Sequence, residues 1–91
     1  MSARLHVYFT GHVQGVGFRY AVRTVSLEFD VTGWVKNLED GRVEILVEGE
    51  RSELEAFQAA IPDAGLRRLI RDIQTRWSEG TGEFRGFEIV R

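Results

Sequence analysis

Apolar and polar residues alternate along three segments of the chain, and a period of two is typical of β-strands with one buried face. The three segments are residues 4–10, 31–36 and 43–48. The alternation is weaker in residues 69–77 and 84–90, which still contain β-branched and aromatic residues. The pattern therefore predicts four strands and a short last strand.

Two other segments have apolar residues at helical spacing, and we expect each to form a helix with one buried face. In the first segment these residues are Phe18, Ala21, Val22, Val25 and Phe29. In the second segment they are Leu54, Phe57 and Ile61. Residues 52–55, Ser-Glu-Leu-Glu, fit a capping box at the start of the second helix. Pro62 ends that helix because proline cannot continue its hydrogen bonds.

Residues 39–41, Glu-Asp-Gly, predict a hairpin turn in which Asp40 and Gly41 supply positive φ values. The order of elements is then strand, helix, strand, strand, helix, strand and a short last strand. A connection through a helix makes the first two strands parallel, and we expect the third strand to lie between them. The predicted class is α+β: a ferredoxin-like βαββαβ sandwich, with one mixed sheet and both helices on one face.

The length of 91 residues, 43% of them hydrophobic, suits a single domain over residues 1–91 with one core. No segment approaches the roughly 20 apolar residues of a membrane-spanning helix, and no signal sequence is evident. We therefore expect a cytoplasmic protein with no membrane partner. The net charge of −2 argues against a dedicated nucleic-acid binder. We interpret Arg67, Arg68 and Arg71 as a solvated segment.

The chain has no cysteine and only two histidines, His6 and His12. The first fact excludes disulfides, a thiolate nucleophile and metals bound by cysteine. Two histidines at this spacing are too few for a histidine metal site. We assign no catalytic role to either histidine.

Residues 11–19 contain three glycines and end in Arg19, where the first predicted helix begins. Glycine permits positive φ and close backbone approach, so successive N–H groups can turn toward one anion. A helix N-terminus adds unpaired N–H donors, and arginine adds a planar fork suited to two phosphate oxygens. The segment predicts a phosphoryl-binding loop made of the N–H groups of Gln14, Gly15, Val16, Gly17 and Phe18 with the Arg19 guanidinium.

Two alternatives stay open for the Gln14 side chain: its amide orients the loop, or it is solvated. We interpret Phe18 and Trp34 as packing residues rather than as surfaces for a substrate.

Asn37 is the second candidate residue, and strand geometry suggests its position. Val31, Gly33 and Val35 must face the helices, and counting by twos places Asn37 on the same side at the carboxyl end of its strand. If the first two strands are parallel, Asn37 and Arg19 lie at the same edge of the sheet. The amide of Asn37 could then orient a water near the phosphoryl group. The alternative is that Asn37 only begins the turn.

Two motifs resemble the acylphosphatase family. One is Gly-x-Val-Gln-Gly-Val-x-Phe-Arg at residues 11–19, and the other is Gly-Trp-Val-x-Asn-x-x-Asp-Gly-x-Val-Glu at residues 33–44. The similarity extends to residues 86–89, Gly-Phe-Glu-Ile. The resemblance implies a ferredoxin-like fold, no metal or cofactor, and hydrolysis of carboxylic–phosphoric mixed anhydrides. It also implies that Arg19 and Asn37 are catalytic.

Our hypothesis is therefore an enzyme that hydrolyses a small acyl phosphate, with inorganic phosphate as product and competitive inhibitor. We expect a monomer, and the sequence does not identify the physiological acyl group.

Two alternatives remain. The first is a regulatory domain that binds phosphate or an acyl phosphate without turnover. The second is an RNA-binding module of the same fold, in which Tyr8 and Trp34 stack bases on the open sheet face. Glu44 and Glu48 share that face and would repel phosphates.

Overall fold

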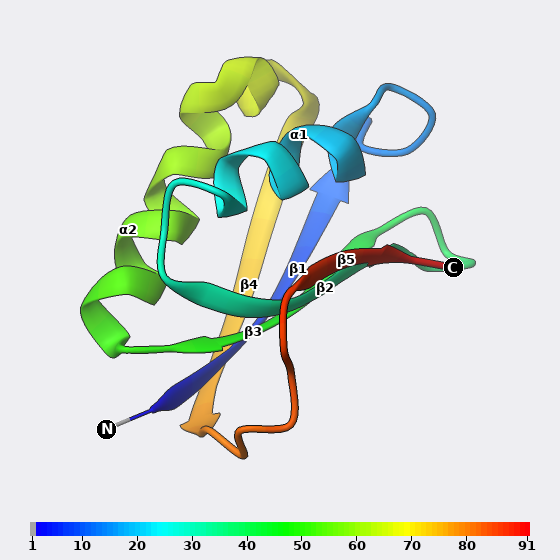
Figure 1. Ribbon diagram of the computed structural model, residues 1–91. Helices are drawn as coiled ribbons and strands as arrows, with labels where there is room; N and C mark the ends of the chain where they lie inside the picture. Colours follow the sequence, from blue (N-terminus) through cyan, green and yellow to red (C-terminus); the bar gives the residue numbers. More distant parts are fainter. Residues whose placement is uncertain (1) are drawn as a thin grey trace.

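Five strands form one sheet in the order β4-β1-β3-β2-β5, and two helices lie across one of its faces (Figure 1). The computed structural model describes residues 2–91. The elements in chain order are β1 (Ala3–Gly11), α1 (Phe18–Ser26), β2 (Val31–Asn37), β3 (Val43–Gly49), α2 (Arg51–Ile61), the short helical segments η1 (Pro62–Leu66) and η2 (Arg67–Leu69), β4 (Ile70–Glu79) and β5 (Phe87–Val90). The predicted ferredoxin-like α+β class is confirmed.

The central strand β3 pairs antiparallel with both β1 and β2. Strands β1 and β2 are therefore parallel to each other with β3 between them, as the connection through α1 predicted. Strand β4 pairs antiparallel with β1 at one edge, and β5 pairs parallel with β2 at the other. The carboxyl ends of β1, β2 and β5 consequently lie at the same end of the sheet (Figure 1).

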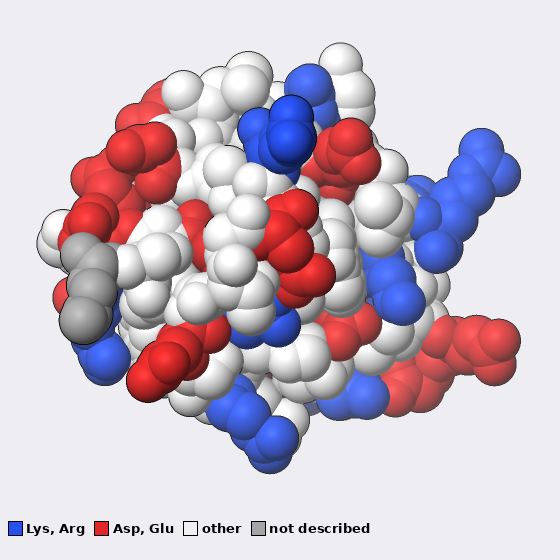
Figure 2. Space-filling view, turned by 60° about the horizontal axis from the view of Figure 1, so that its bottom comes forward, with Lys and Arg blue, Asp and Glu red and all other residues white. Residues whose placement is uncertain are grey.

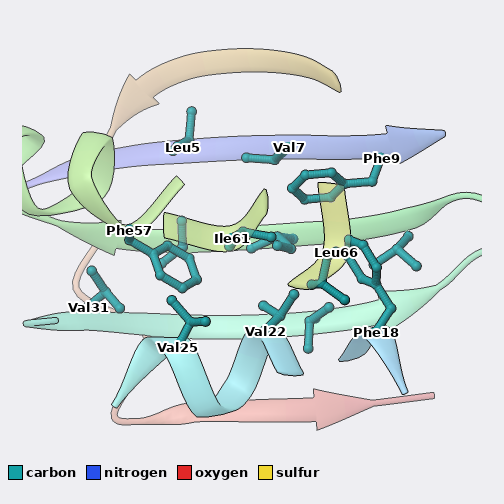
Figure 3. Close-up of a cluster of buried hydrophobic side chains, with 14 of the residues drawn as sticks. Leu5, Val7, Phe9, Phe18, Val22, Val25, Val31, Phe57, Ile61 and Leu66 are labelled. Carbon is teal, nitrogen blue, oxygen red and sulfur yellow. The ribbon is translucent and has the colours of Figure 1, made fainter. Parts of the chain in front are cut away.

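One hydrophobic core fills the space between the sheet and the helices (Figure 3). On β1 the alternating residues Leu5, Val7 and Phe9 are at most 1% exposed. The helix residues that face them are Phe18, Val22 and Val25 from α1 and Leu54, Phe57 and Ile61 from α2. Burying one such side chain fully stabilises a fold by about 1.5–3 kcal/mol. This layer therefore fixes both helices on the sheet.

The turn between β2 and β3 differs from the prediction. Gly41 has a φ of 96°, but among residues 2–91 no residue other than glycine has a positive φ, so the expectation for Asp40 is wrong. The Gly41 N–H donates to the Leu38 carbonyl at 3.2 Å, and the Leu38 N–H donates to the Arg42 carbonyl at 2.8 Å. A β-turn followed by one left-handed glycine thus replaces a two-residue turn with two positive φ values.

Several element boundaries also differ. Helix α2 begins at Arg51 with Glu50 at the cap position, so Ser52 lies inside the first turn and the predicted capping box is wrong. Helix α1 ends at Ser26, and Phe29 packs against the core from beyond it. The helix end at Pro62 is confirmed. Strand β4 extends to Glu79, and β5 is shorter than residues 84–90.

A buried carboxylate on β3 holds the loop between β4 and β5. The Glu48 side chain is 3% exposed and accepts a hydrogen bond from Arg4 Nε at 2.7 Å. It also accepts from the N–H groups of Thr81 at 2.9 Å and Gly82 at 2.8 Å, and from the Thr81 hydroxyl at 3.0 Å. Burial raises the pKa of Glu48, but these donors together outweigh it and lower the pKa to about 2.

Glu48→Gln should remove the charge from this cluster while keeping the size of the side chain. We expect the free energy of unfolding at pH 7 to fall by about 2–3 kcal/mol, because hydrogen bonds to a charged group are lost. Because folding lowers the pKa of Glu48, its stabilisation is present above the usual pKa of 4.5 and is lost as pH falls toward about 2. The stabilities of wild type and Glu48→Gln should therefore approach each other toward pH 2. Urea unfolding of both proteins between pH 7 and pH 2 measures this change.

The matched control is Glu55→Gln, whose side chain is 59% exposed on α2 and should change stability little. If the difference in free energy of unfolding between wild type and Glu48→Gln stayed constant down to pH 2, the lowered pKa assigned to Glu48 would be contradicted.

Candidate active site

The loop between β1 and α1 depends on glycine for its backbone conformation. Gly15 has a φ of 76° and Gly17, at the N-cap of α1, has a φ of 80°. A Cβ atom at either position would meet nothing within 4 Å, so the constraint comes from the backbone and not from space. A residue other than glycine would cost about 1–2 kcal/mol in this left-handed region.

Buried side chains anchor the two ends of this loop. Val13 and Phe18 are each 1% exposed, and the Phe18 ring lies 5.2 Å from the Phe9 ring, centroid to centroid. This contact confirms Phe18 as a packing residue. Between the anchors the loop is exposed, and Val16 retains 42% of its accessible surface. The core therefore fixes where the loop begins and ends.

The backbone N–H groups of this loop are available as donors. The first hydrogen bond of α1 is from Ala21 N–H to the Gly17 carbonyl at 3.0 Å. Within residues 2–91, the N–H groups from Gln14 to Tyr20 donate to no protein acceptor. Unpaired amides at a helix N-terminus, with the positive end of the helix dipole, form a site for an anion.

Arg19 lies in the first turn of α1, and its guanidinium contacts the last strand. Its Nη1 donates to the Val90 carbonyl at 3.4 Å. The parallel edge strand β5 thereby helps to orient the arginine beside the loop. The side chain is only partly exposed, so the cation lies against the protein surface and not out in solvent.

Asn37, the last residue of β2, faces the same cleft as Arg19. The cleft has a volume of about 210 Å³, and both residues line it together with Gly15, Gly17 and Phe18. The carbonyl oxygen Oδ1 of Asn37 is buried and has no hydrogen-bond partner among the described residues. An acceptor in this state favours a donor from outside the protein, such as a water O–H.

Gln14 connects the loop to the hairpin that follows Asn37. Its Nε2 donates to the carbonyls of Leu38 at 2.7 Å and Arg42 at 2.8 Å. Of the two alternatives for this side chain, orientation of the loop is therefore the observed one. Both amide hydrogens are used, so only the backbone N–H of Gln14 is available to an anion.

Sequence reasoning missed three residues that line the cleft, namely Val13, Tyr20 and Ile89. Tyr20 is 70% exposed. It directly follows Arg19, and this place in the sequence could have indicated that it lies near the cleft. Ile89 pairs in register with Val35 on β2, which was not evident before the parallel pairing of β5 was known.

No group of three or more His, Cys, Asp or Glu side chains within residues 2–91 is placed to hold a metal ion. Activity without metal and without a cofactor stays a prediction. In the same part of the chain, no helix is long and apolar enough to span a bilayer.

The open sheet face carries the aromatic residues of the RNA-binding alternative. The Arg42 guanidinium lies 4.6 Å from the Tyr8 ring centroid, and Lys36 lies 5.4 Å from that of Trp34. Glu44 is the register partner of Tyr8. Figure 2 shows acidic and basic side chains mixed over the face that it displays, and not gathered into one basic surface. This arrangement disfavours stacking of bases beside a phosphate backbone.

Comparison with known proteins identifies the family. The sequence matches the family Acylphosphatase over residues 5–89. A curated acylphosphatase of Roseiflexus sp. (strain RS-1) is 44% identical over 88 residues, which cover 97% of this chain and 95% of that protein. The chain belongs to the acylphosphatase family. The hydrolase activity predicted from the two motifs is thereby confirmed.

Solved structures agree with this assignment. The crystal structure of acylphosphatase from Bacillus subtilis matches with a TM-score of 0.89 at 37% identity, covering 98% of this chain and 99% of that chain. The structure of T. kodakarensis HypF matches with a TM-score of 0.80 at 33% identity, covering 100% of this chain but 12% of that chain. The fold of this chain therefore also occurs as a part of a larger protein.

Gln14→Glu should test the connection between the loop and the hairpin. The change replaces an amide donor by a carboxylate that faces two carbonyl oxygens. We expect the free energy of unfolding to fall by about 1–3 kcal/mol and the affinity for inorganic phosphate to fall with it. Urea unfolding and calorimetric titration with phosphate measure the two effects.

Gln74→Glu, at an exposed position on β4, adds the same charge outside the cleft and serves as the control. Equal stability and equal phosphate affinity for Gln14→Glu and Gln74→Glu would show that the Gln14 hydrogen bonds do not support the loop.

Proposed function

We propose that the N–H groups of residues 14–18 and the Arg19 guanidinium bind the phosphoryl group of an acyl phosphate, and that Asn37 orients the attacking water. The observation that carries this proposal is the shared cleft: Arg19, Asn37 and the loop glycines line one space of about 210 Å³. The unpaired N–H groups of the same loop add further donors.

The phosphoryl group is held by donors that are fixed before the substrate binds. Negative charge on the equatorial oxygens is stabilised by such preorganised N–H groups and by the guanidinium fork. The loop is anchored by Val13 and Phe18, so little reorganisation accompanies binding. Positioning and charge stabilisation are the main contributions that a protein makes to phosphoryl transfer.

Asn37 supplies the position of the nucleophile. Its Oδ1 accepts a hydrogen bond from the water, which places the water oxygen near phosphorus and opposite the carboxyl oxygen that leaves. An uncharged amide suits this role because a carboxylate would repel the phosphoryl oxygens.

The reaction balances without a metal or a strong general base. The water oxygen forms a bond to phosphorus while the bond between phosphorus and the carboxyl oxygen breaks. The carboxylate leaves with the electron pair of that bond, and the water proton passes to a phosphate oxygen. The carboxylate is a good leaving group, so the attacking water needs little activation.

Substitutions should separate the two roles. Arg19→Ala should lose both phosphate binding and turnover, and Arg19→Lys should not restore them because an ammonium cannot form the bidentate contact. Asn37→Ala should lower kcat about 100-fold while keeping phosphate affinity, because the water is positioned only for the transition state. Hydrolysis of benzoyl phosphate without added metal, with phosphate titration of each variant, measures both properties.

Arg71→Lys, at an exposed position on β4, is the control for the arginine changes. Wild-type turnover by Asn37→Ala would remove Asn37 from the mechanism.

Inorganic phosphate should inhibit competitively and stabilise the folded protein. At a phosphate concentration one hundred times its dissociation constant, the gain is about 2.7 kcal/mol. A thermal shift that grows with phosphate in wild type and vanishes in Arg19→Ala is the expected result. Noncompetitive inhibition would place the phosphate outside the cleft.

A monomeric state and a cytoplasmic location remain predictions. Sedimentation of the purified protein tests the first, and cell fractionation tests the second.

A further inference from the structure

Three exposed large apolar residues lie in or next to the cleft lining, and their side chains have no role in holding a phosphoryl group. Tyr20 and Ile89 line the cleft, and Val16 lies between the lining residues Gly15 and Gly17. Tyr20 is 70% exposed, Val16 is 42% exposed and Ile89 is 36% exposed. Within residues 2–91, Leu27 is the one other large apolar residue that is similarly exposed.

Single exposed apolar side chains are ordinary on protein surfaces, whereas a cluster at a binding site marks a contact surface. The three residues come from three separate parts of the fold, namely the loop, the first turn of α1 and the edge strand β5. Their large exposed fractions mean that the core does not require them. Packing within the protein therefore does not explain the cluster.

The size of the cleft indicates what this cluster contacts. Its volume of about 210 Å³ lies below the roughly 300–1,000 Å³ of clefts that enclose drug-sized ligands. A phosphoryl group and a water beside Asn37 take up part of this volume, next to Arg19 and the loop amides. The rest of an acyl phosphate must then lie against the remaining lining residues, which include Tyr20 and Ile89.

We propose that Val16, Tyr20 and Ile89 form an acyl-binding rim, and that the enzyme prefers acyl phosphates whose acyl group is an apolar chain or ring. This inference rests on the proposed function. Arg19 is the one charged residue among the described residues that line the cleft, and the phosphoryl group uses it. A charged acyl group would lose water at the rim without gaining a partner, whereas an apolar group would lose only contact with water.

A series of acetyl, butyryl and hexanoyl phosphates tests the preference, because the leaving carboxylate stays chemically the same while apolar surface grows. Four fully buried methylene groups would raise kcat/KM about 200-fold. The rim is open on one side and covers only part of the chain, so we expect a rise of about tenfold from acetyl to hexanoyl phosphate.

Two rim variants should flatten this series. Tyr20→Ala and Ile89→Ala are each expected to lower the ratio of kcat/KM for hexanoyl over acetyl phosphate by about threefold to tenfold, since an aromatic or aliphatic contact is removed. Leu27→Ala, at the C-cap of the helix that carries Tyr20 and absent from the cleft lining, is the matched control and should keep the wild-type ratio.

Inorganic phosphate has no acyl group, so its inhibition constant reports on the phosphoryl site alone. If Tyr20→Ala weakened phosphate inhibition and the hydrolysis of both substrates by the same factor, Tyr20 would support the loop and the rim assignment would be overturned. Equal kcat/KM across the wild-type series would overturn the rim and leave the proposed function intact. Failure of the wild type to hydrolyse any of the three substrates would overturn both.

Discussion

The pairing of β3 with both of its neighbours is the constraint on which the site depends. Because β3 is antiparallel to β1 and to β2, β1 and β2 run in the same direction, and their carboxyl ends lie at the same end of the sheet. The glycine loop follows β1, and Asn37 ends β2. A sheet with β1 and β2 antiparallel would place the arginine and the asparagine at opposite ends, and no loop of this length could bring them together.

Among the described residues that line the cleft there is no cysteine and no histidine, so the proposed chemistry depends on the positions of the donors. The core holds Val13 and Phe18, the side chain of Gln14 holds the loop to the next hairpin, and the Val90 carbonyl contacts Arg19. Each contact restricts the position of either the loop N–H groups or the Arg19 guanidinium. Preorganised donors can stabilise transition-state charge without further reorganisation, which is the contribution that such chemistry requires.

The sequence carried enough information to predict the fold and the placement of Arg19 and Asn37 at the same end of the sheet, for a physical reason. Alternation with period two places Asn37 on the buried side of β2, and the helix connection makes β1 and β2 parallel. Both can be inferred from short continuous segments of the sequence. The double hydrogen bond of Gln14 could not be predicted, because its acceptors, the carbonyls of Leu38 and Arg42, are brought together only by the turn.

Other errors have local as well as long-range causes. The pattern at residues 52–55 matches a capping box, yet α2 begins earlier, because the end of β3 determines where the chain enters the helix. Asp40 keeps a negative φ because the loop has room for a β-turn before Gly41. Ile89 was missed because the position of a short strand at the edge of a sheet depends on pairing and not on its own sequence. Ile89 and the acceptors of Gln14 were thus missed because distant segments meet there, whereas the errors at residues 52–55 and at Asp40 concern local backbone geometry.

Contacts far from the cleft also determine its geometry. Glu48 accepts hydrogen bonds from the N–H groups of Thr81 and Gly82 on the open face of the sheet, and this fixes the loop that leads into β5. Strand β5 in turn supplies the Val90 carbonyl that contacts Arg19. A carboxylate buried against the opposite face of the sheet therefore restrains one wall of the cleft through a short length of chain. The cost of burying that charge is offset by its donors, several of which belong to the loop that precedes β5.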